Sequence, residues 1–225
     1  MPVALVTGAN RGLGLEMARQ LLGRGYTVHA TYRDHQGGLA ELNHPDLYLH
    51  AMDVRDTRAV ASVVASIETG LDLLVNNAGV SDGRWSRIED IDFDTVSEVL
   101  NINAVSPVKV TQHCLPLLDR AGGGKVVMLT SLMASLEDCQ SGKSYAYRAS
   151  KTALNMFTVA MKNELAERNI SLLLIHPGWV ETDMGGPNAP VQPEESVNGI
   201  LDRIEEQTLA LSGRFVEYTG RPLPW

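Results

Sequence analysis

Short apolar, β-branched runs alternate along this chain with longer stretches whose apolar residues recur at helical spacing. The runs span residues 3–7, 27–32, 47–52, 71–76, 125–130 and 170–176, each bounded by Gly, Asp, Asn or Pro. Leu13, Met17 and Leu21 illustrate the helical spacing in the first longer stretch. Strands that alternate with helices pair in parallel through right-handed crossovers, and helices then cover both faces of the sheet. The pattern therefore predicts an α/β fold with a doubly wound parallel sheet.

The composition fits one domain and excludes two classes of partner. A hydrophobic content of 44% supports a sizeable core, and a charged content of 20% is too low for disorder. Asp and Glu outnumber Lys and Arg by 27 to 19, and the net charge of −8 repels phosphate backbones and anionic lipid. We therefore expect residues 1–225 to form a single domain that binds neither nucleic acid nor a membrane.

The two cysteines, Cys114 and Cys139, are too few for a disulfide framework, and neither lies at metal-ligand spacing from another Cys or a His. We therefore expect no metal site and a reducing environment. The chain opens directly on the first apolar run, without a basic segment followed by a long apolar one. These features favour a cytoplasmic protein.

A glycine-rich turn follows the first predicted strand. Residues 7–14 place Gly8, Gly12 and Gly14 before a helix that ends near residues 23–25. A pyrophosphate at a helix N-terminus needs backbone N–H groups that no Cβ obstructs, and glycines at these positions meet that need. Glycines also occur in plain turns, but the preceding strand and following helix favour a dinucleotide site.

The end of the second predicted strand decides which dinucleotide fits. A carboxylate there binds the ribose 2′-OH of NAD, whereas an Arg pairs with the 2′-phosphate of NADP. Asp34 lies twenty positions after Gly14, so NAD(H) stays open. Arg33 is nearer the strand end, and Arg11 adds a second positive charge within the glycine turn. We therefore favour NADP(H). The alternative is that Arg33 and Arg11 are ordinary solvated surface residues with no role in cofactor binding.

Tyr147 and Lys151 are four residues apart in a stretch of helical character. At this spacing the two side chains share a helix face, so the ammonium can lie beside the phenol. A free tyrosine has a pKa of about 10, and a neighbouring cation favours the phenolate. Tyr147 is therefore a candidate general acid for a carbonyl oxygen. Tyr145 has no lysine four residues later, so it is a weaker candidate. The alternative for Tyr147 and Lys151 is that they are simply a pair of exposed side chains on one helix.

These motifs and four others occur in the order found in the short-chain dehydrogenase/reductase family, which the chain resembles over almost its whole length. The others are Asp53-Val54, residues 76–79, Thr130-Ser131 and residues 177–182. Residues 147–155 and 176–186 resemble the branch that contains C-factor-like proteins and sniffer-type carbonyl reductases. The resemblance implies a Rossmann-like sheet of about seven strands in the order 3-2-1-4-5-6-7, with helices on both faces.

The resemblance also implies a catalytic set of Asn103, Ser131, Tyr147 and Lys151. Ser131 follows a predicted strand, but sixteen residues separate it from Tyr147, a longer interval than is usual in the family, so Ser135 is a rival. We prefer Asn103 to Asn101 because Pro107 lacks an N–H and cannot bond to the carbonyl four residues earlier. In the family's mechanism, a water held by this carbonyl links the Asn to the Lys.

The remaining motifs predict contacts with the dinucleotide: Asp53 and Val54 with the adenine, residues 77–79 with the ribose side, and residues 177–182 with the nicotinamide. The cofactor-binding residues that we predict are Gly8, Asn10, Arg11, Gly12, Leu13, Gly14, Arg33, Asp53, Val54, Asn77, Ala78, Gly79, Tyr147, Lys151, Pro177, Gly178, Val180 and Thr182.

Two functions are compatible with these residues. The first is an NADPH-dependent oxidoreductase that reduces an aldehyde, ketone or quinone to an alcohol. The second is a regulatory or signalling protein of C-factor type that binds the dinucleotide with little or no turnover. An intact proton-donor set favours the enzyme. We expect residues 81–91, the loop after Ser131 and residues 184–194 to shape its substrate pocket, and the protein to be a monomer or a homodimer.

Overall fold

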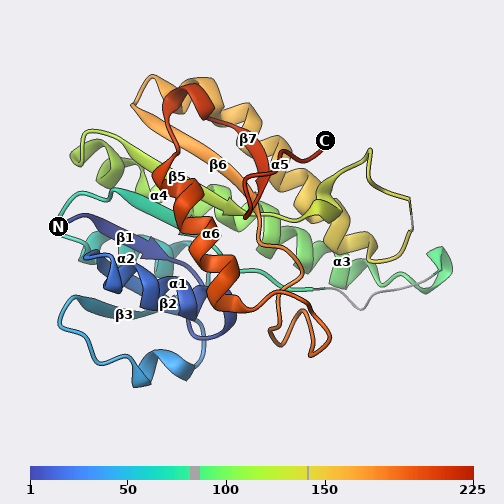
Figure 1. The fold of residues 1–225 in the computed structure, drawn as a ribbon, viewed down its shortest axis with the longest axis horizontal. Coiled ribbons are helices and arrows are strands. Elements are labelled where there is room, and N and C mark those ends of the chain that lie inside the picture. Colours follow the sequence, from blue (N-terminus) through green and yellow to red (C-terminus); the bar gives the residue numbers. More distant parts are fainter. Residues whose placement is uncertain (82–86, 141) are drawn as a thin grey trace.

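Seven parallel strands form one sheet, in the order β3-β2-β1-β4-β5-β6-β7 (Figure 1). The computed structural model describes residues 1–81, 87–140 and 142–225, so residues 82–86 of the segment 81–91 that we expected at the substrate pocket lie outside the described residues. The strands are β1 (Val3–Val6), β2 (Thr27–Tyr32), β3 (Leu47–Ala51), β4 (Leu73–Asn76), β5 (Gly124–Leu129), β6 (Ile170–His176) and β7 (Arg214–Glu217). The predicted strand order is confirmed.

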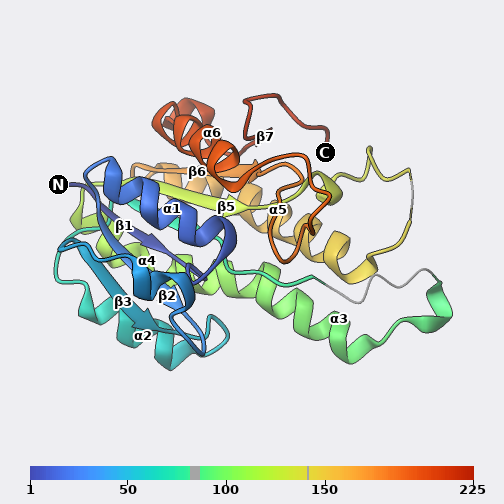
Figure 2. The same cartoon turned by 60° about the horizontal axis from the view of Figure 1, so that its bottom comes forward.

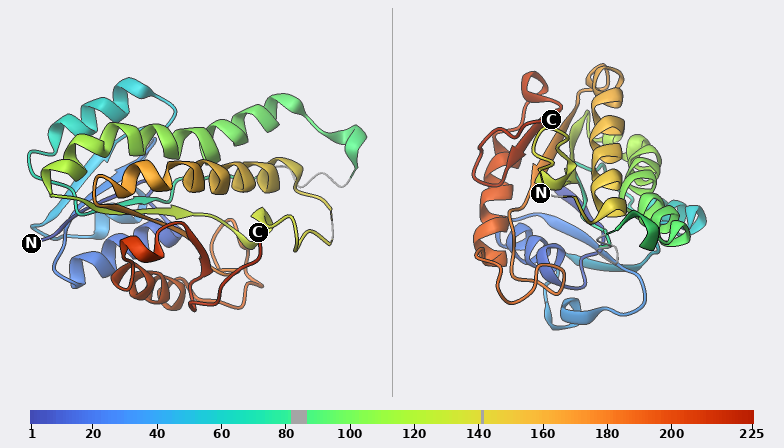
Figure 3. Two further views of the ribbon diagram at one scale, coloured as in Figure 1. Left: turned by 90° about the horizontal axis from the view of Figure 1, so that it is seen from above. Right: turned by 90° about the vertical axis from the view of Figure 1, so that its right-hand side faces the viewer.

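Helices cover both faces of the sheet (Figures 2 and 3). The α-helices are α1 (Gly12–Gly23), α2 (Thr57–Ser66), α3 (Phe93–Leu100), α4 (Ser106–Arg120), α5 (Tyr145–Ala166) and α6 (Pro193–Glu205). Apolar side chains of α1 and α6 pack on one face, and those of α2, α4 and α5 pack on the other. Because both faces are covered, β1, β4 and the first six residues of β6 are buried along their length, which accounts for their unbroken apolar runs.

One long helical segment is divided by a single π-helical turn, η3 (Asn101–Val105), which lies between α3 and α4. The N–H of Ser106 bonds to the carbonyl of Asn101, five residues earlier. Pro107 follows at once and has no N–H with which to continue an α-helical ladder to Asn103. The interruption that Pro107 predicted therefore takes the form of a widened turn, and Asn103 lies inside it, fully buried.

The parallel direction of all seven strands brings the predicted motifs together. The glycine turn, Arg33, Asp53-Val54, residues 77–79, Thr130-Ser131 and residues 177–182 each follow the carboxyl end of a strand, and these ends meet at one edge of the sheet. Asn103 and the Tyr147–Lys151 pair lie instead in helical segments. The order of the sheet reverses between β1 and β4, which is where open α/β sheets bind their ligands. The glycine turn after β1 and residues 77–79 after β4 are therefore neighbours in space.

Candidate active site

The glycine turn has the backbone shape that only glycine adopts readily. Gly8 and Gly12 have φ values of 63° and 53°, in the left-handed region. Gly14 lies in the first turn of α1, where a Cβ would come within 2.9 Å of the Ala9 Cα and still closer to the Gly8 carbonyl. These glycines therefore shape the turn and allow α1 to pack tightly against it.

The N-terminus of α1 fits a pyrophosphate. Arg11 is its N-cap residue and makes no side-chain cap bond, and the first turn of this fully described helix contains no acidic residue. Backbone N–H groups at a helix start have no partner within the helix, and the helix dipole favours an anion there. Arg11 adds positive charge, although its guanidinium is paired with Asp183 at 2.5 Å on the exposed surface. Leu13 is half-buried and packs against the core under α1.

Asn77 and Thr7 join the glycine turn to the loop after β4. The Asn77 amide donates to the carbonyls of Thr7 and Gly8, both at 2.9 Å. The Thr7 hydroxyl accepts from the backbone N–H groups of Asn77 and Ala78, both at 3.0 Å. The side chain of Asn77, which we expected on the ribose side, is therefore engaged in holding the turn. In the same loop, Gly79 lies beside Asn103 and Lys151.

The predicted adenosine end carries paired charges. Arg33 and Asp34 are bonded to one another at 2.7 Å and are both exposed. The Asp53 carboxylate accepts from the guanidinium of Arg55 through both oxygens, and Arg55 also bonds to Glu98. The bond from Arg55 lowers the pKa of Asp53. Arg55 could not be predicted from the sequence, because nothing in a single Asp-x-Arg spacing distinguishes an ion pair from two solvated side chains.

The nicotinamide segment that we predicted, residues 177–182, lies beside the glycine turn. Thr182 is the residue that a Cβ on Gly12 would meet, 3.4 Å from its Cγ2. The Thr182 hydroxyl accepts from the N–H of Gly185, and Val180 pairs with Val191. Gly178 adopts φ 86°, and the Pro177 carbonyl accepts from Ser196. The segment is therefore a fixed turn facing α1.

Lys151 and Asn103 form a buried polar cluster with Gly79. The Lys151 ammonium donates to the Leu129 carbonyl at 2.7 Å and lies 5.8 Å from the centroid of the Tyr147 ring. The Asn103 amide donates to the Val80 carbonyl at 2.8 Å, and its oxygen accepts from the Val80 N–H at 2.9 Å. A Cβ on Gly79 would lie 3.3 Å from the Asn103 oxygen and 3.7 Å from the Lys151 nitrogen, so glycine leaves this space free.

Asn103 also connects this cluster to the helix that carries Tyr147. Its amide donates to the Ser150 hydroxyl at 3.0 Å, and that hydroxyl donates to the Tyr147 carbonyl at 2.8 Å. The side chain of Asn103 thus fixes the π-helical turn, the loop after β4 and the start of α5 relative to one another. Asn101, the alternative, is only part-buried and precedes this contact by two residues.

Burial lowers the pKa of Lys151 to about 8. The folded protein therefore releases the proton more readily than the unfolded chain does. The cost of this buried ammonium to the free energy of unfolding is present in full below about pH 8 and is relieved between pH 8 and 10.5. A buried cation next to a tyrosine, in a site without an ion-pair partner in the described part of the chain, is a feature of functional sites rather than of ordinary cores.

The structure separates the two candidate serines. Ser131 follows β5 directly and is 6% exposed, and its hydroxyl accepts from the N–H of Met133 at 3.1 Å. Ser135 is 2% exposed, and its hydroxyl donates to the Trp225 carbonyl at 3.1 Å while accepting from the Asp138 N–H. Ser135 is therefore fully engaged elsewhere, and Ser131 is the serine that lies at the carboxyl edge.

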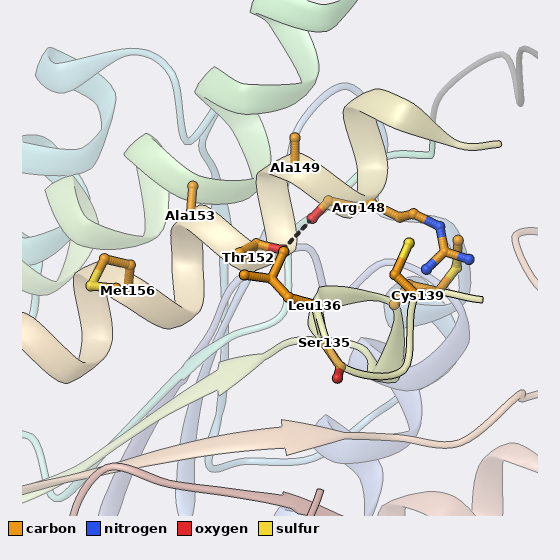
Figure 4. A pocket seen from close by; sticks show the side chains of 9 residues that line it. Ser135, Leu136, Cys139, Arg148, Ala149, Thr152, Ala153 and Met156 are labelled. Carbon is orange, nitrogen blue, oxygen red and sulfur yellow. Dashed lines mark hydrogen bonds between the residues drawn. The ribbon is translucent and has the colours of Figure 1, made fainter. Parts of the chain in front are cut away.

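An apolar groove of about 410 Å³ lies between α5 and the loop that follows Ser131 (Figure 4). Ala149, Ala153 and Met156 line it from the helix, and Leu136 and Cys139 line it from the loop after Ser131. With about 3.6 residues per turn, these helix positions lie opposite Tyr147 and Lys151. Part of the loop that we expected at the substrate pocket therefore faces away from the proposed catalytic residues.

The described residues form neither a membrane-spanning helix nor a cluster of metal ligands. No helix among them is long and apolar enough to cross a membrane. Within the same ranges, 1–81, 87–140 and 142–225, no group of three or more His, Cys, Asp or Glu side chains is arranged to hold a metal ion.

The fold and the glycine turn define a doubly wound α/β protein of the Rossmann type, with a Tyr–Lys pair at the carboxyl edge of its sheet. A family model described as short chain dehydrogenase matches residues 2–192. The chain therefore belongs to the short chain dehydrogenase family and is an oxidoreductase of that family, as its motifs predicted.

Individual proteins agree with the predicted branch. The C-signal protein of Myxococcus xanthus is 43% identical over 155 residues, which cover 69% of this chain and 93% of that protein. The carbonyl reductase Sniffer of D. melanogaster has a TM-score of 0.94, and an NADPH-bound carbonyl reductase from chicken fatty liver has a TM-score of 0.92. Both are 33% identical, and each match covers 100% of both chains.

Proposed function

We propose that this protein is an NADPH-dependent carbonyl reductase that converts an aldehyde, ketone or quinone to the alcohol, with Tyr147 as the proton donor. One observation carries the proposal: Lys151 holds a buried ammonium beside the Tyr147 ring, at the edge of the sheet that also bears the glycine turn. A site for binding alone has no need of a proton donor and a buried cation together.

The residues divide the work by position. Ser131 and Tyr147 would bind the carbonyl oxygen, and Tyr147 would give it a proton. Lys151 would hold the pKa of that phenol down by its charge, and its ammonium would also bind the ribose. Bound NADPH would supply the hydride. The Asn103 side chain completes the set by fixing α5 against the loop after β4. The main-chain carbonyl of Asn103 has no α-helical partner, because the residue four positions later is Pro107, which has no N–H.

We infer that NADP(H) is the preferred cofactor, as the exposed arginines Arg33 and Arg11 suggest. The NADPH held by the chicken liver structure, which matches over the whole chain, supports this preference. Arg33 lies directly after β2, and its partner Asp34 can rotate away because both side chains are more than half exposed. A 2′-phosphate would then replace a weak surface ion pair by a stronger charge-assisted one.

Arg33→Ala tests this preference. We expect the Kd for NADPH to rise about ten- to a hundredfold, because one charge-assisted pair contributes about 1.5–3 kcal/mol. The Kd for NADH should change little, since NADH has no 2′-phosphate. Titration calorimetry with both cofactors makes the comparison, and Asp34→Asn is the matched control that should tighten NADPH binding. Equal losses for NADPH and NADH would contradict the assignment.

The pH dependence of turnover tests Lys151. Because burial lowers its pKa to about 8, the free enzyme loses the ammonium as the pH rises past 8. We expect kcat/KM for NADPH, which reports the free enzyme, to be level below about pH 8 and to fall above it. Steady-state rates from mildly acidic to strongly basic pH give the profile. A profile that stays level well beyond pH 8 would show that this ammonium is not required.

A regulatory function is the second candidate, because the C-signal protein is 43% identical over 69% of the chain. A protein of that kind would bind the dinucleotide through the same glycine turn without turning it over. A panel of aldehydes, ketones and quinones with NADPH separates the two functions. Tight NADPH binding with no oxidation in the presence of any of them would favour regulation.

A further inference from the structure

Residues 221–225, which we call the tail segment, return from β7 to the loop that follows β5 (Figure 3). The segment begins as an antiparallel turn: the Glu217 N–H donates to the Arg221 carbonyl, and the Leu223 N–H donates to the Phe215 carbonyl at 3.0 Å. Leu223 is 6% exposed and belongs to the core beneath α4 and α5. The Trp225 ring lies 5.5 Å from that of Phe215. The tail segment is thus packed against the core through Leu223 and against Phe215 through the half-exposed Trp225 ring.

The carbonyl of Trp225 holds residues 131–139, which we call the serine loop. It accepts from the Glu137 N–H at 2.9 Å and from the Ser135 hydroxyl at 3.1 Å. That hydroxyl in turn accepts from the Asp138 N–H at 2.9 Å. Ser135 is 2% exposed, so water competes little for these bonds. The Ser135 hydroxyl therefore connects two parts of the chain that are 90 residues apart.

The opposite side of the serine loop is fixed by α5. The hydroxyl of Thr152, which lies in α5, donates to the Ala134 carbonyl at 2.8 Å. Between this contact and the end of β5 lies Ser131, whose hydroxyl is held in the same short turn by the Met133 N–H. The turn that aims Ser131 is thus restrained from α5 at Ala134 and from the tail segment at Ser135 and Glu137.

We propose that Ser135 is a positioning residue and that, together with the tail segment, it holds Ser131 in the orientation that carbonyl binding requires. This inference rests on the proposed function of Ser131. It accounts for a buried serine that the catalytic set does not use, and for a tail segment packed against the proposed active-site loop. Misplacing a reacting group by about 1 Å can cost about a hundredfold in rate, so a loop that loses one of its two restraints loses activity without losing its catalytic groups.

Two variants remove the restraint in different ways. Ser135→Ala deletes the hydroxyl, and Trp225→Gly deletes the half-exposed ring that anchors the carbonyl. Ser212→Ala is the matched control: Ser212 is 4% exposed, and its hydroxyl accepts from a backbone N–H, that of Leu172, at the opposite end of the sheet. Trp225→Phe keeps an aromatic ring packed against Phe215, so this variant should behave like the native protein.

The first readout needs no substrate. Amide hydrogen exchange at Met133, which touches neither Ser135 nor Trp225 in a hydrogen bond, reports the turn around Ser131. We expect exchange there to be about tenfold faster in Ser135→Ala and in Trp225→Gly, and unchanged in Ser212→Ala and Trp225→Phe. Unchanged exchange at Met133 in both Ser135→Ala and Trp225→Gly would overturn the inference, whether or not the protein proves to be a reductase.

The second readout is the division between kcat and cofactor binding. We expect kcat for carbonyl reduction to fall about tenfold in Ser135→Ala and in Trp225→Gly. The Kd for NADPH should stay within about twofold of the native value. An equal fall of kcat in Ser212→Ala would show that general loss of stability causes the effect, and would overturn the positioning role. If the native protein reduces no carbonyl, the proposed function fails on that ground, and exchange at Met133 still decides the role of Ser135.

Discussion

Replacing Tyr147 with phenylalanine should lower kcat for carbonyl reduction by about a thousandfold, because a positioned general acid contributes about 10²–10⁴ in rate. The substitution keeps the ring beside the Lys151 ammonium, 5.8 Å from its centroid, and removes only the hydroxyl. Binding of NADPH should therefore change by no more than a few-fold. Single-turnover oxidation of NADPH measures the rate, and fluorescence titration measures the affinity.

Tyr145→Phe is the matched control for this experiment. Tyr145 begins the same helix, but the residue four positions later is Ala149 and not a lysine. We expect this variant to keep most of the native turnover. Retained turnover in Tyr147→Phe would remove Tyr147 from its proposed role, and equal losses in both variants would point to damage at the start of α5.

Gly14→Ala should be the most damaging single change in the glycine turn. A helical position normally gains about 1 kcal/mol from Gly→Ala, but here the new Cβ would lie 2.5 Å from the Asn77 amide nitrogen and 2.9 Å from the Ala9 Cα. Overpacking of this kind costs about 1–3 kcal/mol, and the turn must open to relieve it. We expect a lower free energy of unfolding by urea and a Kd for NADPH raised about a hundredfold.

Gly23→Ala, in the same helix, provides the comparison. Nothing lies within 4 Å of a Cβ at Gly23, so only the helix propensity acts there and the variant should be as stable as the native protein or slightly more so. A lowered free energy of unfolding together with native cofactor affinity in Gly14→Ala would contradict a phosphate site at this turn, because the turn would then have been disturbed without any effect on binding.

The order of the sheet could be predicted because it depends on features that are local in the sequence. Each buried strand is a short apolar run, and the family resemblance supplied the order that alternation alone leaves open. The strand β7 has only four residues, of which two are buried, and it was not recognisable as a separate run. A short edge strand of this kind lacks the length that distinguishes a strand from a loop.

The proposed catalytic residues could be predicted because their spacing is regular and local. Tyr147 and Lys151 are one helical turn apart, and Pro107 marks the interruption at Asn103. The charge pairs could not be predicted in the same way. Arg55 bonds to Asp53 because of the local turn after β3, whereas its bond to Glu98 depends on how α3 packs. Pairing of this kind follows from tertiary structure and leaves no periodic signal.

The division between Ser131 and Ser135 depended on a contact between distant parts of the chain. Both serines follow the same strand, and spacing to Tyr147 did not separate them. The Ser135 hydroxyl is engaged by a carbonyl 90 residues away, which no local pattern encodes. The same limit applies to Asn77, whose amide turns back to Thr7 and Gly8.

The most direct test of the account is the fate of the hydride. The native protein is incubated with NADPH deuterated at C4, as each epimer in turn, and with a panel of aldehydes and ketones, and the products are examined by mass spectrometry. We predict an alcohol with deuterium on the carbinol carbon from one epimer only, formed about a thousandfold more slowly by Tyr147→Phe. NADPH that binds tightly while every carbonyl in the panel is recovered unreduced would contradict the account.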